Sequence, residues 1–112
     1  MSDEKQARNG ALAIELERDG NTVMVSLRGE ADLATAASLE DQLKQALGCG
    51  ADRVIVDLSA LYFIDSTSLR VLLKAALASE EDSARLYFLR GRTQVERILR
   101  VSGVKQRLRF LD

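Results

Sequence analysis

The sequence predicts an α/β domain with a mixed β-sheet, which opens with an antiparallel hairpin and continues with parallel strands covered by amphipathic helices. Apolar and polar residues alternate over residues 12–16 and again over 23–27, which is the spacing of strands with one buried face. Asp19 and Gly20, between these segments, form a tight-turn signal. Beyond the hairpin, helical apolar stripes alternate with short apolar segments, which is typical of parallel strands joined by helices.

The two ends of the chain differ in character. Residues 1–10 are polar and show no apolar period, so we expect a flexible N-terminal arm. We expect residues 11–112 to form one domain, because a chain of 112 residues has the usual size of a single domain and shows no linker-like change in composition.

The first helix and the central strand follow from changes of apolar period after residue 29. A helix is predicted from a stripe of apolar residues that ends before Gly48, with Asp32 or Thr35 as its cap. The members of the stripe are Ala36, Leu39, Leu43, Ala46 and Leu47. Residues 54–58 are mostly apolar and β-branched, as expected of a central strand covered on both faces.

The second half of the chain repeats this alternation. The clearest helical stripe begins at Asp65-Ser66 and consists of Leu69, Leu72, Leu73, Ala76 and Leu77. Residues 86–89 read as the next strand, which makes the helix between the two strands a parallel crossover. A capping box over residues 93–96 opens a third helix that Gly103 ends, and Leu108 and Phe110 suggest a short last strand.

Composition excludes several classes of function. Sixteen basic and 17 acidic residues leave a net charge of -1, so no bulk attraction to nucleic acid is expected. The chain has no histidine, and Cys49 is its only cysteine, which argues against a zinc site and suits a reducing compartment. No apolar run reaches membrane-spanning length. We therefore expect a cytoplasmic protein without metal, cofactor or membrane insertion.

The segment 59–65 carries the candidate site, because ligands of open α/β sheets gather at strand-to-helix turns. Three hydroxyl residues, Ser66, Thr67 and Ser68, occupy the first helical turn. Free backbone N–H groups and the positive end of the helix dipole favour an added phosphate there. The alternative is simple helix capping by Asp65 or Ser66, worth about 1 kcal/mol.

Other residues allow more than one interpretation. Asp32, Asp57 and Asp65 are candidates for a Mg²⁺ site, although each also suits a cap, a strand end or a turn. Tyr62 and Phe63 suit either exposed contacts for a partner or core positions under the loop, and we expect one of the two to lie in the core. The basic C-terminal quarter is either a docking face or, more simply, a solvated surface; its residues are Arg90, Arg92, Arg97, Arg100, Lys105, Arg107 and Arg109.

Residues 54–72 resemble the signature of the anti-sigma factor antagonist family, the bacterial STAS domains. Residues 29–33, Gly-Glu-Ala-Asp-Leu, resemble that family's Gly-Glu-x-Asp-Leu element, and residues 95–103 with Phe110 resemble its closing helix and strand. The resemblance extends from about Leu12 to the end of the chain.

This resemblance implies a STAS-like fold and a regulatory, non-catalytic function. The unphosphorylated domain would bind an anti-sigma factor that is also a serine kinase and so release a sigma factor. Phosphorylation of Ser66, which matches the family's phosphoacceptor serine, would end the interaction, and a serine phosphatase would restore it. The implied environment of this serine consists of Asp32, Asp65, Thr67, Ser68, Leu69 and Arg70.

Two departures from the family pattern leave other functions open. Ser68 and Arg70 stand where the family has glycines, so both are expected to add bulk near the contact, and Ser68 adds a third hydroxyl. One alternative is a STAS scaffold that is not phosphorylated, or an accessory subunit of a membrane transport system. A receiver-type domain with Asp57 as phosphoacceptor is disfavoured, because the chain opens with a hairpin.

Overall fold

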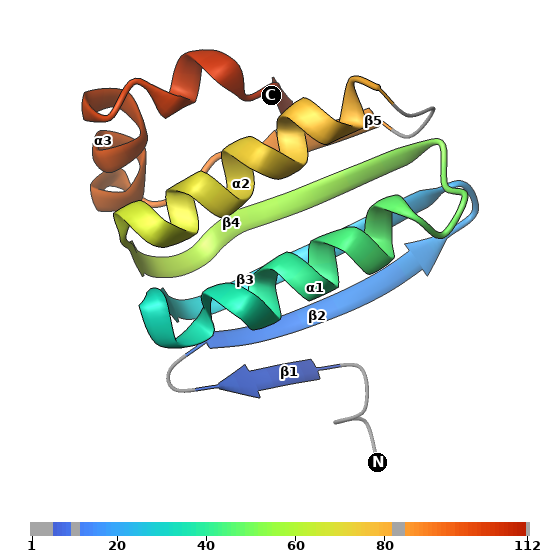
Figure 1. Cartoon of the computed structure of the whole chain (residues 1–112), viewed down its shortest axis with the longest axis horizontal. Coiled ribbons are helices and arrows are strands. Elements are labelled where there is room, and N and C mark those ends of the chain that lie inside the picture. Colours follow the sequence, from blue (N-terminus) through green and yellow to red (C-terminus); the bar gives the residue numbers. More distant parts are fainter. Residues whose placement is uncertain (1–5, 10–11, 82–84, 112) are drawn as a thin grey trace.

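The computed structural model describes residues 6–9, 12–81 and 85–111, and Figure 1 shows their arrangement. A six-stranded sheet has the strands in sequence order. They are β1 (Gln6–Asn9), β2 (Leu12–Asp19), β3 (Thr22–Ala31), β4 (Arg53–Ile64), β5 (Arg85–Leu89) and β6 (Phe110–Leu111). Strands β1 to β3 pair antiparallel, and β3 to β6 pair parallel. The mixed sheet and its hairpin, which turns at Gly20, are therefore confirmed.

In the described ranges, three helices connect the parallel strands. They are α1 (Ala36–Leu47), α2 (Ser66–Ser79) and α3 (Thr93–Val101), and short 3₁₀ turns, η2 (Leu33–Thr35) and η3 (Val104–Arg107), flank α1 and α3. Helices α1 and α2 lie side by side on one face of the sheet (Figure 1). Successive crossovers of one hand between neighbouring strands place their helices on the same face.

The core fills the space between this face and the helices as one cluster. Its fully buried members from the strands include Val25, Val56 and Phe88, and those from the helices include Leu39, Leu72 and Leu99. Ile55 also has little exposure, at 8%, yet it is outside this cluster because it lies on the opposite face. No helix of the described residues covers that face, so the expectation that residues 54–58 are covered on both faces is wrong.

Strand β4 is longer than the sequence pattern suggested. Its pairing with β3 shifts after Ser26 and again after Gly29, and each shift marks a bulge or irregularity. The Ser59 backbone N–H donates to Asp57 Oδ1 at 2.9 Å next to the first shift. Because these irregularities interrupt the two-residue period, residues 59–64 do not look like a strand, although β4 continues through them to Ile64.

The N-terminal region also differs from the prediction. Residues 6–9 form strand β1, which pairs antiparallel with β2, whereas a flexible arm was expected over residues 1–10. Main-chain pairing at a sheet edge needs no apolar period, so the polar sequence gave no signal for it. The rest of the expected arm, residues 1–5 and 10, lies outside the described residues.

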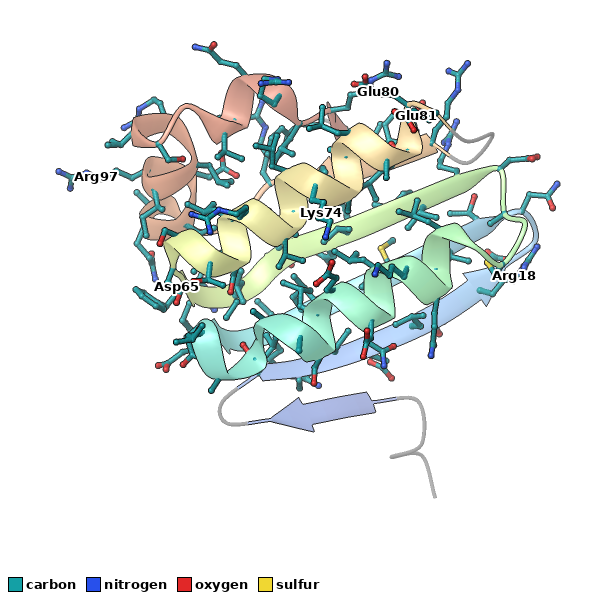
Figure 2. The ribbon with its side chains drawn as sticks, in the orientation of Figure 1. Arg18, Asp65, Lys74, Glu80, Glu81 and Arg97 are labelled. Carbon is teal, nitrogen blue, oxygen red and sulfur yellow. The ribbon has the colours of Figure 1, made fainter. Side chains whose placement is uncertain are left out.

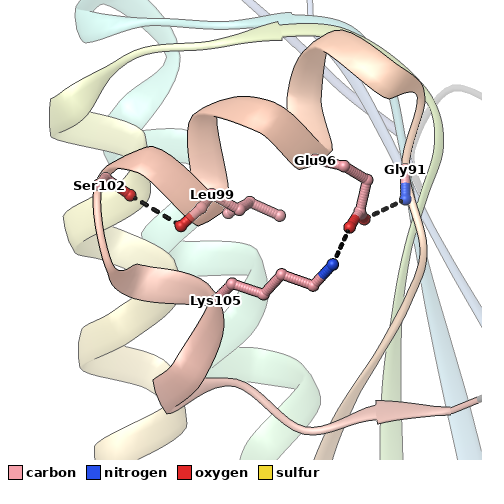
Figure 3. Close-up of polar contacts among 5 residues, drawn as sticks. All are labelled: Gly91, Glu96, Leu99, Ser102 and Lys105. Atoms are coloured by element: carbon pink, nitrogen blue, oxygen red, sulfur yellow. Dashed lines mark hydrogen bonds and ion pairs between the residues drawn. The ribbon is translucent and has the colours of Figure 1, made fainter.

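The carboxylate of Glu96 holds the start of helix α3 to the preceding loop, but it does not form the capping box that was expected over residues 93–96. The helix begins at Thr93 with Arg92 as N-cap, and Glu96 Oε2 accepts a hydrogen bond from the Gly91 N–H at 2.8 Å. The other oxygen lies 2.7 Å from Lys105 Nζ (Figure 3). Burial acts to raise the pKa of Glu96, but the bonds from Lys105 and Gly91 outweigh it and leave the pKa below its usual value.

We predict that Glu96→Gln lowers the free energy of unfolding by about 1–2 kcal/mol at pH 7, because a charge-assisted contact is lost. Since the pKa of Glu96 is lower in the folded state, this stabilisation is present above the unfolded-state value of about 4.3 and is lost as the pH falls through the folded-state pKa. Urea unfolding at several pH values measures it. The exposed Glu81→Gln is the control, and an equal loss in both variants would contradict the prediction.

Candidate functional site

The candidate site lies where β3 and β4 end together. Ala31 and Ile64 are paired at the ends of the two parallel strands, so Asp32 and Asp65 follow at the same edge of the sheet. The Asp65 N–H donates to the Ala31 carbonyl at 3.0 Å and joins the two loops. Figure 2 shows Asp65 at the start of α2, close to the beginning of α1. The strand-to-helix turn on which the candidate site was predicted is therefore confirmed.

Asp65 is the N-cap of α2. Its backbone is extended, with φ -100°, and its Oδ1 accepts the Ser68 N–H at 2.9 Å. Its carbonyl accepts the Leu69 N–H at 2.9 Å. Of the two predicted caps, Asp65 is the one used, and Ser66 becomes the first helical residue. The hydroxyl of Ser66 therefore lies in the first turn, where the helix dipole favours negative charge.

The hydroxyl residues of this turn have different surroundings. Ser66 is exposed and Thr67 is half-buried, whereas Ser68 is fully buried. Ser68 Oγ donates to the Asp32 carbonyl across a distance of 3.4 Å, a long hydrogen bond that reaches the β3–α1 loop. The bulk that Ser68 was expected to add near the contact is therefore not exposed, because its side chain fills space between two loops.

Asp32 has a structural role in the neighbouring loop. It is the N-cap of η2, and its backbone N–H donates to Thr35 Oγ1 at 2.9 Å. Thr35 in turn is the N-cap of α1, so both predicted caps are used, one after the other. The structure thus brings Asp32, Asp65 and Ser68 together. Among the remaining predicted site residues, Leu69 is buried in the core and Arg70 is exposed on α2.

Large apolar side chains are exposed next to this turn. Leu33 is 74% exposed, Tyr62 51% and Phe63 43%. Neither aromatic residue is a core residue, so the prediction that one of them is buried is wrong; Leu61 and Ile64 occupy the inward positions instead. Leu33 was missed, although an apolar residue directly after a cap was a usable signal. We call Leu33, Tyr62, Phe63, Ser66 and Arg70 the carboxyl-edge surface.

Residues at the start of α3 contact Tyr62 and fix its position. The Arg92 guanidinium carbon lies 4.3 Å from the centre of the Tyr62 ring, a cation–π distance. Gln94 Nε2 also donates to the Tyr62 carbonyl at 3.4 Å. Because Arg92 adjoins Gly91, the Glu96 contact described above also fixes the loop that positions this guanidinium.

The three aspartates do not form a metal site. Asp57 lies on β4 well before Asp65, about 25 Å away along an extended strand. Within the described ranges, no three His, Cys, Asp or Glu residues are grouped so that they could hold a metal ion. In the same ranges, no helix is both long and apolar enough to cross a membrane.

A mixed sheet with helices on one face and a capped, serine-bearing helix at its carboxyl edge defines a small α/β domain of known architecture. The chain belongs to the STAS domain family, since the family described as "Mlab, STAS domain" matches residues 14–111. The resemblance noted in the sequence is thus confirmed for the fold and the domain family.

The chain is similar to proteins named as anti-sigma factor antagonists. The anti-sigma-F factor antagonist RsfB of Mycobacterium tuberculosis is 29% identical over 62 residues, which cover 55% of this chain and 51% of RsfB. The chain therefore spans about half the length of that relative. The anti-sigma factor antagonist SpoIIAA in its unphosphorylated form has a TM-score of 0.73 at 24% identity, covering 89% of each chain.

Two further structures extend the comparison. The phosphorylated form of SpoIIAA from Bacillus has a TM-score of 0.67 at 22% identity, covering 89% of this chain and 92% of that one. The murine anion transporter Slc26a9 has a TM-score of 0.72 at 16% identity, covering 96% of this chain and 21% of the transporter. These likenesses establish the fold, which therefore occurs both in a small regulator and within a much longer transporter chain.

We predict that Asp65→Ala lowers the free energy of unfolding by about 1 kcal/mol, because it removes the side-chain cap of α2. Asp65→Asn, which keeps an oxygen for the Ser68 N–H, should lose only a few tenths of that amount. Urea unfolding of the three proteins measures the difference, and equal losses in both variants would show that the hydrogen bond is not the stabilising element.

Proposed function

We propose that this domain is an anti-sigma factor antagonist that binds an anti-sigma factor through its carboxyl-edge surface and is switched by phosphorylation of Ser66. The observation that carries the proposal is the accessible Ser66 hydroxyl in the first turn of α2, beside a buried and therefore protected Ser68. The names of RsfB and SpoIIAA support the class of partner, and the phosphorylated SpoIIAA structure supports the kind of switch.

The proposed binding step uses the exposed apolar side chains around this serine. Leu33, Tyr62 and Phe63 are exposed on the loop and strand end that flank α2, a concentration of apolar surface that marks contact sites in soluble proteins. Arg92 over Tyr62 holds one of these rings in a fixed position before a partner arrives. A partner that covers this surface would also cover Ser66.

The proposed switch is electrostatic. The partner, an anti-sigma factor that is also a serine kinase, transfers the γ-phosphoryl group of ATP to Ser66 Oγ, and ADP and the hydroxyl proton leave. The phosphoryl group adds nearly two negative charges close to Asp65, and the bound state would have to desolvate them. Within the domain, the helix N-terminus tolerates the same charge. A loss of about 3 kcal/mol would weaken binding roughly a hundredfold.

A serine phosphatase hydrolyses the phosphoserine and restores binding. The domain, which includes β1, acts as one cytoplasmic unit that supplies a surface and an acceptor, while the ATP site and the catalytic groups belong to the partner.

The decisive test is phosphorylation by the anti-sigma factor kinase encoded nearest to this gene. After incubation with ATP, intact mass and peptide mapping should find one phosphoryl group on Ser66. Ser66→Ala should remain unmodified, whereas Thr67→Ala, which removes the neighbouring hydroxyl, should still be modified. Phosphorylated protein should bind the kinase about a hundredfold more weakly.

Other outcomes have distinct meanings. Stable kinase binding without phosphorylation would remove the switch and leave a scaffold. Co-purification with a membrane transport complex instead of a soluble kinase would favour the accessory-subunit alternative, a placement that the transporter Slc26a9 illustrates.

A second prediction concerns the surface alone. Leu33→Asp should weaken binding to the anti-sigma factor at least tenfold, because it places a charge in the proposed contact. Val101→Asp is the matched control, since Val101 is 75% exposed and Leu33 is 74% exposed. Calorimetry on both variants measures the effect, and equal affinities would remove Leu33 from the interface.

A further inference from the structure

The face of the sheet opposite α1 and α2 carries an ordered pattern of side chains. Strand pairing aligns three rows across β2, β3, β4 and β5 on this face. The rows are Asp19, Thr22, Arg53 and Arg85; Glu17, Met24, Ile55 and Tyr87; and Glu15, Ser26, Asp57 and Leu89. We call these residues the open face.

The centre of the open face is apolar. Ile55 is 8% exposed, and Met24, Tyr87 and Leu89 are half-buried. None of these residues is among those buried in the core cluster or packed against it. Their partial burial therefore comes from their neighbours on the same face, and no helix of the described chain covers them. Such an apolar centre with a charged rim is the arrangement of an interface.

The two sides of the rim carry opposite charge. Glu15, Glu17 and Asp19 make the β2 side acidic, while Arg53 and Arg85 make the β4–β5 side basic. The Arg53 guanidinium carbon lies 5.4 Å from the centre of the Tyr87 ring. A hydrogen bond from Arg85 is the main cause that lowers the pKa of the Tyr87 hydroxyl, so both arginines gather at this ring.

From this pattern we propose that the open face binds a second copy of the chain, forming a face-to-face dimer. A two-fold axis parallel to the strands, between β3 and β4, places β2 of one copy over β5 of the other. Asp19 then faces Arg85, and Met24 faces Ile55, in both halves of the interface. An axis across the strands would instead place acidic β2 over acidic β2, which like-charge repulsion disfavours.

Two charged residues, Arg28 and Asp57, do not fit the separation into an acidic β2 side and a basic β4–β5 side. The proposed axis nevertheless brings them close to charges of opposite sign. Arg28 lies on β3, one row beyond Ser26, and Asp57 lies on β4 beside Ser26. The axis brings Arg28 of one copy into the row next to Asp57 of the other, so these charges also meet with opposite sign. The strands of the two sheets run in nearly the same direction, which is the aligned packing common for sheet pairs.

The dimer is expected to be weak and dependent on salt. Only the middle row of the open face has an apolar centre, and charged residues flank it in the rows on either side, so we expect association in roughly the micromolar range rather than an obligate dimer. Its charge pairs lie on an exposed rim and are screened by salt. The carboxyl-edge surface lies at one end of the sheet, so dimer formation leaves Ser66 accessible and is independent of the proposed phosphorylation.

Sedimentation equilibrium over about 5–500 μM protein tests the proposal with two charge-reversed variants. Glu17→Arg with Asp19→Arg makes the rim basic throughout, and Arg53→Glu with Arg85→Glu makes it acidic. Each variant alone should have a dimer dissociation constant at least about tenfold higher than the wild type. An equimolar mixture of the two should form heterodimers again.

Arg97→Glu with Arg100→Glu is the control, because both residues are exposed on α3, where Figure 2 shows Arg97 pointing away from the sheet. Its dimerisation should match the wild type, and circular dichroism should show that all variants are folded. A wild type that stays monomeric throughout, variants that dimerise normally, or a mixture that stays monomeric would each overturn the proposal.

Discussion

The parallel pairing of β3 with β4 is the constraint on which the rest of the structure depends. It begins with Thr22 beside Arg53 and ends with Ala31 beside Ile64. Two chain segments 33 positions apart in the sequence therefore stop at the same place, and the bond from the Asp65 N–H to the Ala31 carbonyl holds them there. This pairing therefore determines the position of the capped start of α2 and of Ser66 within it.

The order of the strands has a second consequence. Because each parallel strand is added next to its predecessor through a crossover of the same kind, the helices share one face and one core cluster. The opposite face is left to the side chains of the strands themselves. A small domain built in this way has two surfaces that differ in kind: an apolar and hydroxyl-bearing edge, and a broad sheet face with divided charge.

Most of the regular structure could be predicted from the sequence, because it depends on side-chain period. The alternation at Leu12, Ile14 and Leu16 identified β2, and the stripe from Leu69 to Leu77 identified α2, both of which the structure confirms. The turn that carries the candidate site could also be predicted, since Asp65 is a favourable cap at the end of a strand.

What could not be predicted depends on contacts between distant segments. The end of β4 was not predicted because irregular pairing interrupts its apolar period. Strand β1 was not predicted because main-chain hydrogen bonds do not require any particular side-chain pattern. The different surroundings of Ser66 and Ser68 were hidden for a related reason. Two serines in one helical turn look alike in sequence, and only the approach of the β3–α1 loop buries one of them.

The burial of Ser68 also sets a size limit at that position. Its side chain is completely enclosed, with the hydroxyl between the first turn of α2 and the Asp32 carbonyl, so a larger residue would have to separate the two loops. The glycine of the wider family and the serine of this chain are both small enough for that space. Sequence variation at this site should therefore follow side-chain volume, and polarity should matter much less.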